Sequence, residues 1–172
     1  MPERGDVRRT LATVDMMIVD DNLPMRTLLR SVLRAVGVVR IREASDGEEA
    51  LDQLSMRGAD LILLDHAMPG ITGIELVRAL RANPEHPSAK ARIVMITGYG
   101  DRQHVAAARD AGVDEFLVKP ITIRGLLLRL EAALAKGREF VDVENFHGPD
   151  RRRRVAGAPG GEERRTADEQ LI

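Results

Sequence analysis

Short, almost wholly apolar segments recur along the chain up to about residue 135, each separated from the next by a longer segment. Apolar runs with little alternation are typical of strands that are covered on both faces, as in a parallel sheet. The pattern predicts five such strands, at residues 16–19, 38–41, 61–64, 93–96 and 116–118.

The segments between these strands have apolar residues three and four positions apart, the spacing of one helix face. In the first, Asn22 is a candidate N-cap, Pro24 lies in the first turn and Gly37 closes the helix. Four more helices are predicted, at residues 46–57, 73–82, 101–111 and 122–135. The inner faces of the first and last helices are predicted to contain Met25, Leu28, Leu29, Val32, Leu33 and Val36, and Ile123, Leu126, Leu127, Leu130 and Leu134.

Five strands that alternate with five helices predict a doubly wound α/β fold, with a parallel sheet between two helical layers. In open sheets of this kind, ligands bind beyond the carboxyl ends of the strands, where the strand order reverses. The residues at those ends are therefore the first candidates for chemistry.

Polar residues stand at the carboxyl ends of four predicted strands. They are Asp20 and Asp21 after the first, Asp65 after the third, Thr97 and Gly98 after the fourth, and Lys119 and Pro120 after the fifth. Three converging carboxylates would repel one another unless a cation joined them, and Mg²⁺ suits oxygen ligands. A carboxylate can also attack phosphorus to form an acyl phosphate, whose charge Lys119 and Thr97 would stabilise.

These residues form motifs that resemble the CheY-like response-regulator receiver family. The motifs are the Asp20–Asp21 pair, Asp65, Met68, Pro69 and Gly73 in D-x-x-M-P-x-x-x-G, the Thr97–Gly98 step, and Phe116-x-x-Lys119-Pro120. The resemblance covers roughly residues 14–135. It implies a flavodoxin-like (βα)5 fold with strand order 2-1-3-4-5.

By this resemblance Asp65 is the phosphoacceptor. Mg²⁺ would be bound by Asp20, Asp21, Asp65 and the backbone carbonyl of Ala67. Because Ala67 cannot orient a water molecule with a polar side chain, we expect a long-lived acyl phosphate.

The resemblance also implies a phosphoryl-binding switch. Lys119 would pair with a phosphoryl oxygen, aided by a cis peptide bond to Pro120. Thr97, followed by Gly98, would move inward, and Phe116 would fill the space that Thr97 leaves. This would change the surface formed by the fourth helix, the fifth strand and the fifth helix. Phe116 lacks the hydroxyl of the frequent Tyr, and Tyr99 could roof the site.

The two ends of the chain differ in composition from the receiver domain predicted at residues 16–135. Residues 1–15 have no periodicity and are predicted to be a mobile lead-in. Residues 136–172 form an Arg-rich extension that is predicted to be partly disordered. A short piece of it could pack back onto the domain through Val141, Val143 and Phe146.

Asp150 and the run Arg151, Arg152, Arg153 and Arg154 have two interpretations. One is a solvated charged tail. The other is a binding site for an anionic nucleotide, because Arg pairs bidentately with phosphate and with guanine. The tail is similar in composition to Arg-rich extensions of some receiver proteins that bind cyclic di-GMP and act at the flagellar motor.

Composition excludes several other classes. There is no Cys among the 172 residues, which excludes disulfides and a Cys nucleophile. A formal net charge of −1 and the lack of a DNA-binding module argue against binding DNA. No apolar stretch suits a signal peptide or membrane insertion, so a cytoplasmic protein is expected. The four His residues lack metal-ligand spacing and are predicted to lie on the surface.

The sequence thus predicts a stand-alone response regulator of a two-component phosphorelay, phosphorylated by a histidine kinase or a histidine phosphotransfer protein. It would signal by binding a target such as the flagellar motor or a kinase. We expect no enzyme activity beyond self-phosphorylation and slow hydrolysis. An α/β phosphatase that uses Asp65 as nucleophile is disfavoured, because Ala67 replaces the second catalytic Asp.

Overall fold

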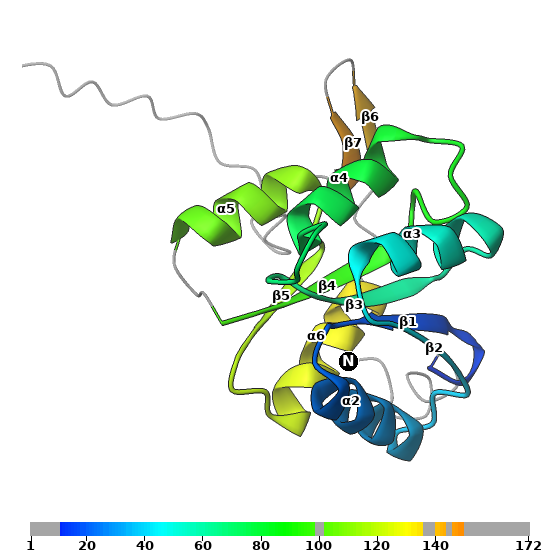
Figure 1. The fold of residues 1–172 in the computed structure, drawn as a ribbon, viewed down its shortest axis with the longest axis vertical. Coiled ribbons are helices and arrows are strands. Elements are labelled where there is room, and N and C mark those ends of the chain that lie inside the picture. Colours follow the sequence, from blue (N-terminus) through cyan, green and yellow to red (C-terminus); the bar gives the residue numbers. More distant parts are fainter. Residues whose placement is uncertain (1–10, 99–101, 136–139, 144–145, 150–172) are drawn as a thin grey trace, which may run out of the picture.

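The computed structural model describes residues 11–98, 102–135, 140–143 and 146–149. Its centre is a five-stranded parallel sheet with the predicted strand order, β2-β1-β3-β4-β5. The strands are β1 (Asp15–Val19), β2 (Arg40–Ala44), β3 (Leu61–Asp65), β4 (Arg92–Thr97) and β5 (Glu115–Val118). They alternate with helices α2 (Leu23–Ala35), α3 (Gly47–Met56), α4 (Gly73–Ala82), α5 (Arg102–Ala111) and α6 (Ile123–Ala135), so the predicted doubly wound α/β fold is confirmed (Figure 1).

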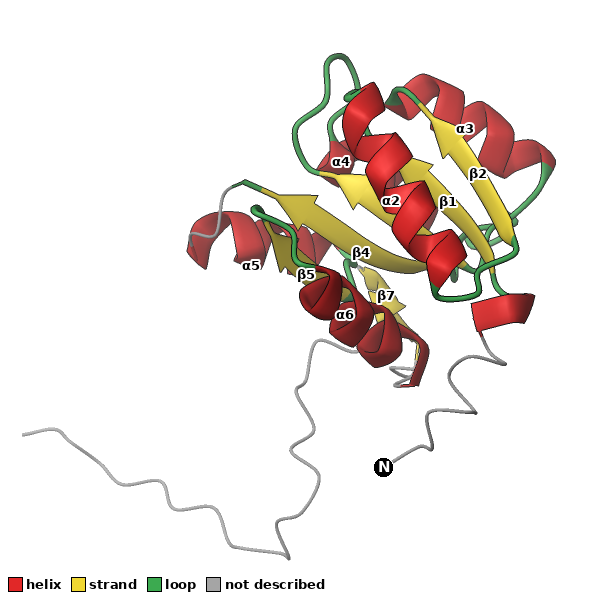
Figure 2. Cartoon of the chain, turned by 90° about the horizontal axis from the view of Figure 1, so that it is seen from below, coloured by secondary structure: helices red, strands yellow, loops and turns green. Residues whose placement is uncertain are grey.

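Helices cover both faces of the sheet, with α2 and α6 on one face and α3, α4 and α5 on the other (Figure 2). Each face has its own hydrophobic core. Met16 and Ile18 of β1 belong to the core under α2 and α6, whereas Met17 and Val19 belong to the opposite core. This alternation follows from the period of two along a strand.

The prediction of strands buried on both faces is correct for the inner strands and wrong for the edge strands. Every residue of β1 and β3 is buried, whereas β2 is largely half-buried. The strand predicted at 38–41 lies at Arg40–Ala44 instead, because Val38 is buried ahead of the strand and Val39 is exposed. An edge strand has a neighbour on one side only, so it does not need an apolar run.

The ends of α2 agree with the prediction. The Asn22 side chain accepts a hydrogen bond from the Met25 N–H at 2.9 Å, and Gly37 follows the helix with a φ of 103°. The inner faces were predicted less well, because Leu28 is 53% exposed and Ile123 is 60% exposed. Both helices turn a narrower apolar stripe toward the sheet than the three-and-four spacing suggested.

The predicted lead-in is wrong for the residues that the structure describes. Leu11 and Val14 are buried in the core under α2 and α6, and β1 begins at Asp15. Two apolar residues four positions or fewer from a central strand reach its core easily. Residues 1–10 lie outside the described part of the chain.

The extension after α6 contains an antiparallel hairpin of β6 (Phe140–Val143) and β7 (Phe146–Pro149). β7 lies next to α4, so a short piece of the extension does return to the domain (Figure 1). The tail residues 150–172, including Asp150 and the four Arg residues, lie outside the described residues, and the nucleotide hypothesis stays a prediction.

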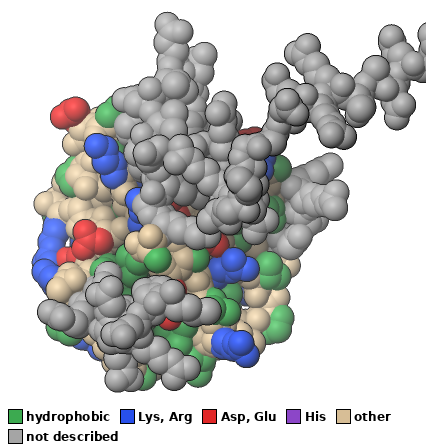
Figure 3. Space-filling view, turned by 180° about the vertical axis from the view of Figure 1, so that it is seen from behind, with side chains coloured by type: hydrophobic (Ala, Val, Ile, Leu, Met, Phe, Trp, Pro, Cys, Tyr) green, Lys and Arg blue, Asp and Glu red, His purple; other side chains and the backbone are tan. Residues whose placement is uncertain are grey.

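Charged side chains of both signs are interspersed on the described part of the face shown in Figure 3. Within the described residues, none of the helices has the length and hydrophobicity of a membrane span. His66 and His86 are half-buried and thus only partly at the predicted surface, and the side chains of His104 and His147 lie outside the description.

Candidate metal and phosphoryl site

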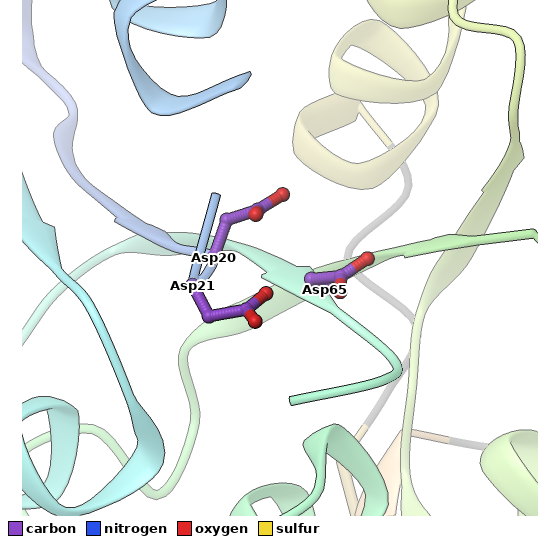
Figure 4. A group of neighbouring side chains, drawn as sticks. All are labelled: Asp20, Asp21 and Asp65. Carbon is purple, nitrogen blue, oxygen red and sulfur yellow. The ribbon is translucent and has the colours of Figure 1, made fainter. Parts of the chain in front are cut away.

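Three carboxylates meet at the carboxyl end of the sheet (Figure 4). Asp20 and Asp21 directly follow β1, and Asp65 is the last residue of β3, which pairs with β1. One oxygen from each carboxylate lies within 4.8 Å of the others. The parallel pairing of β1 and β3 therefore brings together the acidic residues that the sequence singled out.

Asp20 is held at three of its polar groups. Its N–H donates to the Ala44 carbonyl at 3.3 Å, and its Oδ1 accepts from the Asn22 N–H at 2.8 Å. Its carbonyl accepts from Nη1 of Arg26 at 2.6 Å. The fourth group, Oδ2, is buried and has no hydrogen-bond partner among the described residues. Since buried polar atoms are almost always satisfied, this oxygen is suited to a ligand.

The electrostatics of the cluster also favour a cation. Burial raises the pKa of the Asp20 carboxyl, and the negative charges of Asp65 and Asp21 raise it further. The Asn22 N–H and the Lys119 ammonium act in the opposite direction. A hard divalent cation would relieve the repulsion and satisfy Oδ2, so three oxygen donors of this kind fit Mg²⁺.

Asp65 has a cationic partner from the segment that follows the edge strand β5. Its side chain is 6% exposed, and its Oδ1 accepts from Nζ of Lys119 at 2.8 Å. Lys119 follows β5, and its N–H donates to the Thr97 carbonyl at 2.8 Å, which ties it to the end of β4. The Lys119–Pro120 peptide bond is cis, as predicted.

The remaining predicted residues lie on β4, β5 and the loop after β3. Thr97 is buried at the end of β4, and Gly98 is exposed beside it. Phe116 is opposite Met95 in the β4–β5 pairing and packs, half-buried, against the core under α3, α4 and α5. Ala67 is exposed in the loop after Asp65, and Tyr99 lies outside the described residues.

Gly73, a motif residue, has a steric role that its spacing did not reveal. A Cβ at this position would lie 2.4 Å from the Asp65 carbonyl oxygen, a backbone atom that cannot move aside cheaply. The Gly73 N–H also donates to the His66 carbonyl at 3.1 Å. The start of α4 can therefore approach the acceptor strand only because residue 73 has no side chain.

Sequence reasoning missed Arg26 altogether. Its side chain is 13% exposed and reaches from the first turn of α2 to the Asp20 carbonyl. From helix periodicity alone, the side chain of an Arg at such a position is expected to be solvated. Its position four residues after an expected N-cap and six after Asp20 was the available signal.

Comparisons with known proteins agree with this site. The model of the response regulator receiver domain matches residues 16–131. The chain is 36% identical to the chemotaxis protein CheY of Pseudomonas aeruginosa over 116 residues, which cover 67% of this chain and 92% of that protein. It is 39% identical to the cyclic di-GMP phosphodiesterase response regulator RpfG of Xanthomonas campestris over 117 residues, which cover 67% of this chain but 30% of RpfG.

A solved CheX–CheY–BeF3–Mg²⁺ complex from Borrelia burgdorferi has a similar fold. The TM-score is 0.65 at 28% identity, and the match covers 72% of this chain and 90% of that chain. Sequence motifs, strand order and family match point to the same assignment. The chain belongs to the response regulator receiver domain family, and its described core is a CheY-like receiver of the kind used in two-component signalling.

Proposed function

We propose that this receiver is phosphorylated on Asp65 in a Mg²⁺-dependent reaction, with a histidine kinase or a histidine phosphotransfer protein as the phosphodonor. One observation carries the proposal: a buried Asp65 carboxylate, paired with Lys119, lies beside a buried Asp20 oxygen that has no partner among the described residues. A nucleophile, a cation for the phosphoryl charge and a metal ligand thus occupy one site.

In the transfer, an Asp65 oxygen attacks the phosphorus of a phosphohistidine. A P–O bond forms as the P–N bond breaks, and the imidazole nitrogen keeps the electron pair of that bond. Bound Mg²⁺ would supply positive charge against the carboxylates and the phosphoryl oxygens. The side chains of Asp20, Asp21 and Asp65 and the carbonyl of Ala67 would hold it. Lys119 would exchange its Asp65 oxygen for a phosphoryl oxygen.

Output would follow from rearrangement at the ends of β4 and β5. The Thr97 hydroxyl would bond the phosphoryl group, and Phe116 would move into the vacated space. The surface affected is formed by α5, β5 and α6, where Val118 is 47% exposed and Ile123 is 60% exposed. Exposed apolar side chains beside a switching site suit a protein partner. The relative crystallised with CheX supports a protein target of this kind.

The phosphorylated state would decay slowly. Ala67 is exposed two residues after the acceptor and has no polar atom in its side chain with which to orient an attacking water. Introducing a polar side chain in Ala67→Asn should accelerate dephosphorylation. An unchanged rate would count against this part of the proposal.

Phosphorylation itself can be tested with a small phosphodonor. The protein is incubated with acetyl phosphate and Mg²⁺, and the phosphoryl adduct is measured by intact-protein mass spectrometry. We expect an adduct in the wild type that hydroxylamine removes, as an acyl phosphate requires, and none in Asp65→Asn. Asp52→Asn, which changes an exposed Asp on α3, is the matched control and should behave as the wild type. An adduct in Asp65→Asn would refute the assignment.

A further inference from the structure

We propose that Arg26, held by Glu43, is a positioning residue for the metal site, because it fixes the Asp20 backbone so that the unpartnered Asp20 oxygen faces the cation. This inference rests on the proposed Mg²⁺-dependent function. It concerns a side chain that would touch neither the metal nor the phosphoryl group. Its effect would pass through the main chain of one metal ligand.

The contacts of Arg26 are unusual for an Arg in the first turn of a helix. Its Nη1 donates to the Asp20 carbonyl at 2.6 Å, and its Nε lies 3.5 Å from Oε2 of Glu43. Nε is buried and makes no hydrogen bond within the described residues, so Glu43 balances the charge of Arg26 without a well-aligned hydrogen bond. The guanidinium therefore has one short directional contact, and that contact is with Asp20.

This arrangement costs stability in two ways. A cation near the N-terminus of α2 opposes the positive end of the helix dipole. Burial of an Arg with an unsatisfied N–H adds a desolvation cost. A neutral, solvated residue at position 26 would avoid both costs, so the buried position of Arg26 is best explained by its contact with the ligand loop.

Strand β2 helps to hold both peptide groups of Asp20, one directly and one through Arg26. The carbonyl of Ala44 accepts from the Asp20 N–H, and the preceding residue, Glu43, holds Arg26 against the Asp20 carbonyl. Both peptide groups of Asp20 are thus fixed by one neighbouring strand. With Oδ1 bound to the Asn22 N–H, the carboxylate plane has little freedom and Oδ2 keeps its direction.

Mg²⁺ should be sensitive to this restraint, because it demands near-ideal octahedral geometry. Residues that orient metal ligands from the outer shell typically contribute 10- to 100-fold in affinity. Loss of the Arg26 contact would free the Asp20 carbonyl, and the loop could relax away from the position that the metal requires.

Arg30 offers a matched control. It also pairs with Glu43, at 2.8 Å, and it carries the same charge on the same helix, but its side chain is 49% exposed and, among the described residues, it forms no hydrogen bond or ion pair with Asp20. Arg26→Met and Arg30→Met therefore remove the same charge and an ion pair with the same acid. They differ in the contact with the metal ligand and in burial, and thermal unfolding measures the consequence of the second difference.

The experiment is a calorimetric Mg²⁺ titration of the full chain, with phosphorylation rates from acetyl phosphate measured across Mg²⁺ concentrations. We expect Arg26→Met to raise the Mg²⁺ dissociation constant about 10-fold. We expect Arg30→Met to stay within about 2-fold of the wild type, and the isosteric Glu43→Gln to fall between them. At saturating Mg²⁺, the phosphorylation rate of Arg26→Met should return to the wild-type value.

Thermal unfolding of the same variants without Mg²⁺ separates positioning from stability. A purely structural role predicts a lower melting temperature for Arg26→Met with an unchanged dissociation constant, and that result overturns the inference. If Arg26→Met does not fold, a wild-type dissociation constant in Glu43→Gln overturns it as well. If the wild type neither binds Mg²⁺ nor is phosphorylated, the proposed function is overturned too. If the wild type does both and Arg26→Met binds Mg²⁺ as tightly as the wild type, only the role of Arg26 is overturned.

Discussion

Both ends of the parallel sheet bury charged side chains, but the two ends differ in how many of the buried polar atoms have partners. At the amino end, Asp114 lies 3.5 Å from Arg81 and 3.3 Å from Arg92, and accepts from the Ile93 N–H at 2.9 Å. Arg81 also donates to the carbonyls of Ala89, Ala91 and Gly112. At the carboxyl end lie the two buried side-chain atoms that lack hydrogen-bond partners among the described residues, in Asp20 and Arg26.

The pKa shifts show the same contrast. Burial raises the pKa of both Asp114 and Asp20. At Asp114 the hydrogen bond from the Ile93 N–H and the charges of Arg81 and Arg92 all counter that rise in pKa. At Asp20 the Asn22 N–H and the Lys119 charge counter it, but the carboxylates of Asp65 and Asp21 add to it. Burial also lowers the pKa of Arg81 to about 10. The amino end is a completed ion-pair network, whereas at the carboxyl end Lys119 pairs with Asp65 and Oδ2 of Asp20 has no partner among the described residues.

The largest expected effect comes from breaking the completed network. Arg81→Met leaves the buried Asp114 with Arg92 as its remaining charged partner, and loss of one partner from a buried pair typically costs about 3–5 kcal/mol. Urea unfolding measures the change. The protein that remains folded should still be phosphorylated on Asp65 by acetyl phosphate. A loss below about 1 kcal/mol would show that the network does not stabilise the fold as argued.

A steric prediction tests how tightly the carboxyl end is built. In Gly73→Ala the new Cβ would meet the Asp65 carbonyl oxygen at 2.4 Å, so α4 or the acceptor strand must shift. Overpacking of this kind costs about 1–3 kcal/mol, and phosphorylation should slow.

Gly98→Ala is its control for stability, because a Cβ at Gly98 would meet nothing within 4 Å among the described residues. Unfolding curves of the two variants compare a glycine that is sterically required with one that is not. The phosphorylation rate of Gly73→Ala is compared with that of the wild type, because Gly98 belongs to the predicted phosphoryl-binding residues. If Gly73→Ala matches the wild type in both measurements, the close approach of Gly73 is not needed.

The sequence predicted the carboxyl end of the sheet better than any other part. A strand end determines where a residue lies, and the parallel strand order determines its neighbours, so the sequence alone could place Asp65 and Lys119 at one site. Motif spacing located Gly73 as well. The spacing could not reveal the reason for Gly73, because the close approach to Asp65 depends on how α4 packs.

The burial of long charged side chains could not be predicted from the periodic pattern. Arg26 and Arg81 are both cations on helices, and a periodic pattern places both on the solvent side. Whether an Arg is buried depends on which carbonyls and acids the tertiary structure brings within its reach. The edge strand β2 was misplaced for a related reason, since Val38 is buried in the core under α2 and α6 although it precedes the strand.

The same substitution at the two ends should have opposite effects on stability. Asp20→Asn removes a buried charge that neighbouring carboxylates repel, so we expect the metal-free protein to gain about 0.5–2 kcal/mol while Mg²⁺ binding is lost. Asp114→Asn removes the charge partner of Arg81, so we expect a loss of stability. Urea unfolding in a chelator, followed by a Mg²⁺ titration, measures both. A destabilised Asp20→Asn would mean that the carboxyl end is not electrostatically frustrated.

The smallest effect concerns a completed polar pair within the carboxyl end itself. Thr72 and Glu75 form a capping box at the start of α4, next to the acceptor loop. Hydrogen bonds from the Thr72 N–H and hydroxyl lower the pKa of Glu75. The unfolded chain therefore binds the Glu75 proton at a higher pH than the folded protein does. The contribution of Glu75 is present above the ordinary Glu pKa and is lost as the pH falls through the lowered folded value.

Glu75→Gln should accordingly lose a small amount of stability at neutral pH, and the gap from the wild type should close in acid, once Glu75 is protonated in both states. Unfolding curves of the two proteins at neutral pH and at about pH 2 measure the gap. A gap that is independent of pH would assign the effect to the shape of the side chain and not to its charge. If the gap closes, the carboxyl end contains both satisfied and unsatisfied carboxylates, and the unsatisfied one is at the proposed metal position.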